Sequence, residues 1–86
     1  MEGHFIDIAT KYAKSREVGG ARFDSVRFAG SENGFEYYHY FDSRLSGMKL
    51  GIPLMVKIDK NGNAFPVIDA HEAIMAHNRE IRLNRS

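Results

Sequence analysis

The sequence predicts an α+β fold: an antiparallel sheet of about four strands, built from two Asn-Gly hairpins, flanked by an N-terminal and a C-terminal helix in the order α-β-β-β-β-α. Three observations lead to this prediction. Both ends of the chain carry apolar residues at helical spacing, the middle carries runs that alternate apolar and polar residues, and two Asn-Gly dipeptides separate those runs. Because 86 residues are too few for two cores, we expect a single domain over residues 1–86, with both helices on one face of the sheet or one at each end.

The first helix is expected over residues 4–14. Its apolar positions recur at about 100° per residue, and Lys11 and Lys14 lie on the opposite side. The apolar set is Phe5, Ile8, Ala9, Tyr12 and Ala13. The pair Gly19-Gly20 ends this segment, and the alternating pattern begins after it.

The first hairpin is expected to join strands at 22–29 and 35–43 through Asn33-Gly34. Asn-Gly favours a two-residue type I′ turn, in which both central residues have positive φ. The register that follows pairs Val26 with Phe41, Arg27 with Tyr40, and Phe28 with His39.

The second hairpin is expected to join strands at 52–59 and 64–68 through Asn61-Gly62. A two-residue turn here would pair Ile58 with Phe65 and Val56 with Val67. Pro66 has no N–H to donate to a neighbouring strand, so the fourth strand should lie at the edge of the sheet.

The second helix is expected over residues 70–83, with Asp69 as its N-cap. Its apolar stripe comprises Ala70, Ala73, Ile74 and Ile81, with His77 in the middle as a structural histidine. This stripe is predicted to face the core.

Composition excludes several classes of function. The chain has no cysteine, so disulfides and thiolate metal sites are excluded, and no metal or other cofactor is expected. The absence of a signal segment and of an apolar run of about 20 residues favours a cytoplasmic protein without a membrane span. We expect no enzymatic activity, because no phosphate-binding loop, zinc motif or nucleophile elbow occurs.

The aromatic run 35–42, FEYYHYFD, is the most distinctive stretch. Side chains alternate along a strand, so this run divides into two faces. Phe35, Tyr37, His39 and Phe41 are expected to face the core; Glu36, Tyr38, Tyr40 and Asp42 are expected to face outward.

Tyrosine and arginine are preferred anchors of protein interfaces, so the outward face predicts a non-enzymatic protein-interaction module, with a homodimer as its simplest form. The predicted partner-binding residues are Tyr38, Tyr40, Arg27, Arg44, Glu36 and Asp42, with Met48 and Met55 at the margin or in the core. The other interpretation is that Tyr40 packs under Arg27 on the surface and has no further role.

Nucleic-acid binding is the alternative function. The order of helix, antiparallel strands and helix resembles a double-stranded RNA-binding domain, which has a similar length, and this resemblance implies RNA binding. That family has a lysine cluster where this second helix opens with Asp69-Ala70-His71-Glu72, and the fourth strand is extra. The net charge of +1 is also low for a nucleic-acid domain. The alternative site combines the outer tyrosines with the C-terminal arginines Arg79, Arg82 and Arg85.

Overall fold

The computed structural model describes residues 3–45 and 51–85. Its elements are α1 (Ile6–Ser15), β1 (Ser25–Glu32), β2 (Phe35–Phe41), the short 3₁₀ helix η1 (Ser43–Leu45), β3 (Met55–Asp59), β4 (Ala64–Pro66) and α2 (Ala70–Leu83). The strands form one antiparallel sheet in the order β1-β2-β3-β4, which confirms the predicted fold class. Pro66 is in β4, at an edge of the sheet as expected.

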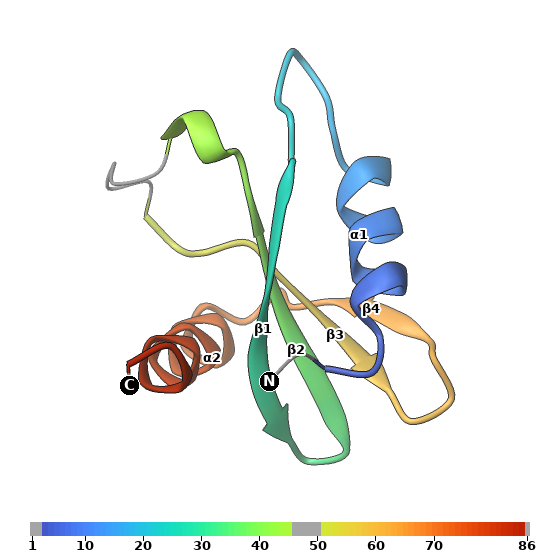
Figure 1. Ribbon diagram of the computed structural model, residues 1–86, viewed down its shortest axis with the longest axis vertical. Coiled ribbons are helices and arrows are strands. Elements are labelled where there is room, and N and C mark those ends of the chain that lie inside the picture. The colour runs from blue at the N-terminus through green and yellow to red at the C-terminus, as the bar shows by residue number, and fades with distance from the viewer. Residues whose placement is uncertain (1–2, 46–50, 86) are drawn as a thin grey trace.

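The two helices cover opposite faces of the sheet (Figure 1), instead of lying together on one face or at its ends. Alanines of α1 pack on one face, in a core with Tyr38, Val56 and Ile58. Alanines of α2 pack on the other face, in a second core with Tyr37 and Met55. The sheet is therefore the middle layer of three, and neither face of β2 is left to solvent. Met48 lies outside the described residues.

The first hairpin turns as predicted, but its register changes along the strands. Asn33 and Gly34 both have positive φ, 54° and 83°, and Glu32 pairs with Phe35. A bulge between Phe28 and Ser31 then adds one residue to β1. The pairs beyond it are Val26 with Tyr40, Arg27 with His39, and Phe28 with Tyr38, so the predicted pairs there are wrong by one residue. A one-residue shift moves every side chain of the strand to the other face.

The second hairpin also differs from its predicted register by one residue. The Gly62 N–H donates to the Asp59 carbonyl, and the Asp59 N–H donates to the carbonyl of Asn63, so three residues form the loop. Ile58 consequently pairs with Ala64 and Val56 with Pro66.

Helix α2 begins at its predicted N-cap, since the Asp69 carboxylate accepts a hydrogen bond from the His71 N–H at 3.1 Å. Its buried side, however, consists of Ala73, Ala76 and Glu80. The predicted apolar stripe is therefore only partly buried: its two isoleucines, Ile74 and Ile81, are 46% and 50% exposed. Two small alanines let the helix backbone lie close to the sheet and turn the larger side chains away from it.

Candidate interaction surface

The outward tyrosines of the predicted site are in the core. Tyr38 is 0% exposed and Tyr40 is 6% exposed, so the expectation that they stand on a free surface is wrong. The reason is that α1 and the segment between α1 and β1 cover this face: Tyr12 of α1 and Phe23 of that segment pack edge-on against the Tyr40 ring, with ring centroids 5.9 and 5.1 Å away. Burial also raises the pKa of Tyr40.

Tyr38 connects β2 to the start of α1. Its hydroxyl accepts a hydrogen bond from the Phe5 N–H at 2.9 Å and donates one to Glu36 at 2.6 Å. Glu36 in turn accepts hydrogen bonds from the His4 backbone at 2.9 Å, and its second oxygen lies 2.8 Å from His4 Nδ1. Burial alone would raise the pKa of Glu36, but these hydrogen bonds outweigh it and hold the pKa below its usual value. Glu36 thus fixes the N-terminal segment to the sheet.

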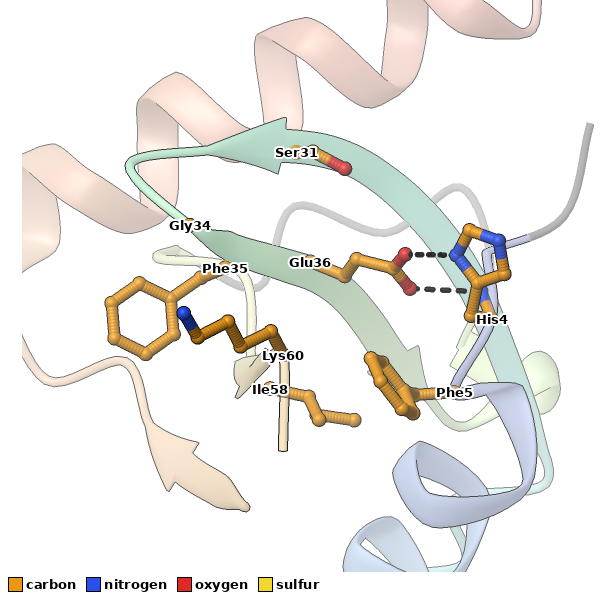
Figure 2. A pocket seen from close by; sticks show the side chains of 8 residues that line it. All are labelled: His4, Phe5, Ser31, Gly34, Phe35, Glu36, Ile58 and Lys60. Carbon is orange, nitrogen blue, oxygen red and sulfur yellow. Dashed lines mark hydrogen bonds and ion pairs between the residues drawn. The ribbon is translucent and has the colours of Figure 1, made fainter. Parts of the chain in front are cut away.

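A hollow of about 300 Å³ opens beside this network, next to the β1–β2 turn (Figure 2). Phe5, Phe35 and Ile58 give it an apolar lining, and Lys60 adds an ammonium group. Figure 2 shows the Glu36 carboxylate directed toward His4, where its oxygens are already hydrogen-bonded. The hollow therefore offers apolar contact area rather than a set of converging catalytic groups.

The remaining charged residues of the predicted site are not brought together. Asp42 is buried and forms an ion pair with Arg44, whose Nη2 lies 2.5 Å from its carboxylate. The hydrogen bonds from Arg44 lower the pKa of Asp42 to about 2. Arg27 lies on the other face of the sheet, where its guanidinium stacks 5.4 Å from the Phe41 ring rather than on Tyr40. The six predicted residues therefore do not form one surface.

The three C-terminal arginines also separate. The Arg79 Nε donates to the Ala29 carbonyl at 3.2 Å, and its guanidinium lies over the Tyr37 ring at 5.2 Å and near Glu32 at 3.5 Å. Arg79 therefore holds α2 on β1. Arg82 and Arg85 are exposed and remain available to a partner.

Two polar networks lie beneath α2. The Tyr37 hydroxyl donates to Glu72 at 2.5 Å, and the same carboxylate lies 2.8 Å from Lys57 Nζ. The hydrogen bonds from Lys57 and Tyr37 lower the pKa of Glu72, whereas burial and the bond to Glu72 raise the pKa of Tyr37. This first network joins the N-terminal half of α2 to β2 and β3.

The second network joins β2 to the C-terminal half of α2. Glu80, which is 5% exposed, lies 2.9 Å from His39 Nδ1, and the His77 ring lies 5.3 Å from that of His39. This grouping does not amount to a metal site, since within residues 3–45 and 51–85 no three His, Asp or Glu side chains could hold a metal ion together. Nor is either described helix long and apolar enough to cross a membrane.

The side of α2 that points away from the sheet is the apolar surface that sequence reasoning missed. We call this side the outer face of α2. Its exposed residues are His71, Ile74, Met75, Asn78, Ile81 and Arg82, followed by Arg85 beyond the end of the helix. The signal that could have found it is the spacing of Ala73 and Ala76, which marks a second, narrower apolar side of the same helix.

The comparisons with known proteins found no relative of this chain. No protein-family model matches the chain, and neither a curated protein nor a solved structure matches it.

Proposed function

We propose that the protein is a small, non-enzymatic protein-interaction module that binds its partner through the outer face of α2. The observation that carries this proposal is the half-exposed pair Ile74 and Ile81. They are seven positions apart, which is about two turns, so they lie on one side of the helix about 10 Å apart. Apolar side chains gathered on one side of a surface helix are typical of a protein-binding site.

The surroundings of this pair support a protein partner. Asn78 lies between the two isoleucines on the helix surface, and Arg82 lies one turn beyond Asn78. An apolar centre with a polar and arginine-containing rim is the usual anatomy of an interface. The aromatic residues that RNA binding would require are Tyr38 and Tyr40, and both are buried, which favours the protein partner over a nucleic acid.

Site-specific photo-crosslinking in intact cells tests this proposal. A photoreactive phenylalanine analogue at Ile74 should give discrete protein adducts, and Ile81→Asp in the same chain should abolish them. The matched control carries the analogue at Lys14, which is exposed on α1, across the sheet. The proposal fails if position 74 gives no protein adduct, or gives the same adducts as position 14.

A salt series distinguishes the RNA alternative. RNA binding that weakens steeply with added salt, and that is lost in Arg82→Gln/Arg85→Gln, would contradict the proposal.

A further inference from the structure

We propose that the hollow beside the β1–β2 turn binds a small aromatic carboxylate, with the ring against its apolar lining and the acid group at Lys60. This site is separate from the proposed partner surface. Phe5 and Ile58, which line the hollow, belong to the core under α1, whereas the outer face of α2 lies on the other side of the sheet (Figure 1). The inference is carried by the size of the hollow, its lining and the sign of its unpaired charge.

The size and the lining of the hollow suit a ligand with one ring. Its volume of about 300 Å³ is at the lower end of the range for small-molecule pockets. Phe5 and Phe35 border it from two different parts of the chain, and the buried Ile58 lies between them (Figure 2). Both phenylalanine rings are only partly buried, so they expose apolar surface that a flat apolar ligand would remove from water.

The unpaired charge of the hollow is the ammonium group of Lys60. Among residues 3–45 and 51–85, no carboxylate forms an ion pair with it. Glu36, the acidic residue of the lining, is directed toward His4, whose N–H and Nδ1 lie 2.9 and 2.8 Å from its oxygens (Figure 2). Asp59, next to Lys60 in the chain, accepts hydrogen bonds from the N–H and the side-chain amide of Asn63 at 2.9 and 3.2 Å. An anionic ligand would therefore meet a cation that the protein leaves uncompensated.

The two ends of the hollow differ in charge, and this difference sets the orientation of the ligand. In Figure 2 the Lys60 side chain extends toward the Phe35 end, whereas the Glu36 carboxylate points the other way, toward His4. A ligand carboxylate at Lys60 would thus lie away from Glu36. Because Lys60 is exposed, its charge should strengthen binding only about two- to fivefold. For a ligand of about ten non-hydrogen atoms, we expect a dissociation constant in roughly the millimolar range.

An NMR titration of the ¹⁵N-labelled full chain tests the site with three probes that share one ring: benzoate, benzyl alcohol and benzylamine. Benzoate should give saturable shifts of the amide signals of Ser31, Gly34 and Glu36, the alcohol should bind more weakly, and the amine should bind most weakly. Lys60→Gln should weaken the binding of benzoate about two- to fivefold and leave that of benzyl alcohol unchanged. Lys14→Gln removes the same charge from the exposed side of α1 and is the matched control, with no effect on either probe.

Three outcomes would overturn the inference. The first is the absence of a saturable shift at these amides with benzoate up to about 20 mM, well above the expected dissociation constant. The second is binding of benzyl alcohol or benzylamine as tight as that of benzoate. The third is an equal loss of benzoate affinity in Lys60→Gln and Lys14→Gln. Photo-crosslinking at Ile74 does not involve the hollow, so the proposed function stands or falls separately.

Discussion

Tyr37 and Tyr38 are neighbours in β2, yet each is buried beneath a different helix, with 3% and 0% of their surfaces exposed. Tyr37 lies in the core under α2, and its hydroxyl is bound to Glu72 of that helix. Tyr38 lies in the core under α1, and its hydroxyl accepts a hydrogen bond from the N–H of Phe5, the residue just before that helix. One dipeptide thus joins both helices to the sheet, and the aromatic strand is the centre of the fold rather than a binding surface.

Tyr38→Phe should lower the free energy of unfolding by about 1–3 kcal/mol, because it leaves the Phe5 N–H and the Glu36 carboxylate without the hydroxyl between them. Denaturant unfolding measures the change. Tyr12→Phe is the matched control: that ring is half-buried, keeps its contact with Tyr40, and should cost less. Equal losses in the two variants would contradict this account. The larger change Tyr38→Ala should cost about 3–5 kcal/mol, enough to unfold a domain of this size.

His39→Phe should destabilise the protein by about 3 kcal/mol or more, because it leaves the Glu80 carboxylate buried without its partner. Glu80→Leu should cost less, since the His39 side chain that it leaves without a partner is more exposed to water than Glu80. The double variant His39→Phe/Glu80→Leu should be more stable than His39→Phe alone. A double-mutant cycle from urea unfolding measures the coupling, and simple additivity would show that the pair does not act as a unit.

Gly30→Ala should cost more than about 1 kcal/mol, for two reasons. Gly30 has a φ of 92°, and an added Cβ would lie 2.7 Å from Cδ of Arg79, which is held by the Ala29 carbonyl. Gly19→Ala is the control, since its φ of 58° carries backbone strain but its Cβ would meet nothing within 4 Å. Thermal unfolding should give Gly30→Ala a lower melting temperature than Gly19→Ala. The reverse order would contradict a packing role for the bulge.

The same bulge marks the boundary between the features of the fold that the sequence predicts correctly and those that it does not. Element order, the Asn33-Gly34 turn, the Asp69 cap and the edge position of Pro66 follow from local chemistry, and all are observed. The predicted assignment of side chains to the two faces of the sheet was wrong, because an extra residue at the bulge moves Val26 and Phe28 to the face that holds Tyr40 and Tyr38. Gly30 is the local signal for that residue, since a glycine inside a strand often marks a bulge. The Arg79 side chain of α2, 50 positions from Ala29 in the chain, packs against the bulge and bonds to the Ala29 carbonyl.

The candidate surface was missed for a related reason. Helical periodicity identifies an apolar side by its largest residues, and it selected a stripe that contained Ile74 and Ile81 together with Ala70 and Ala73. In the folded chain, the side of the helix that packs on the sheet is the one with the small residues Ala73 and Ala76. Polar contacts of Arg79 and Glu80 hold the helix in this orientation. Which of two apolar sides is buried depends on tertiary contacts that a single sequence does not contain.

Acidification should destabilise the protein through Asp42. Its pKa is lowered to about 2 in the folded state from an ordinary value of 3.8, so the unfolded chain takes up the proton more readily. The stabilisation is therefore complete above pH 4 and is lost as the pH falls from about 4 to about 2. Arg44→Gln removes the partner and should flatten the loss of stability over this window. Arg27→Gln, on the other face of the sheet, is the control and should leave the slope unchanged; an equal change in both would exclude the Asp42–Arg44 pair as its cause.

Ile74→Asp and Ile81→Asp should each abolish binding of a protein partner to the outer face of α2 while leaving the fold intact. Both side chains are about half exposed, so the carboxylate stays in water in the free protein, but in the complex it would be buried in the apolar centre of the contact. The yield of protein adducts from a photoreactive analogue at Met75, on the same face, measures the binding. Val18→Asp replaces a more exposed apolar residue, 75%, outside both helices, and should give the same adducts as the wild type. If Val18→Asp reduced the adducts as much as Ile74→Asp, added charge in general rather than the outer face of α2 would be responsible. Circular dichroism of all three variants separates a lost contact from a lost fold.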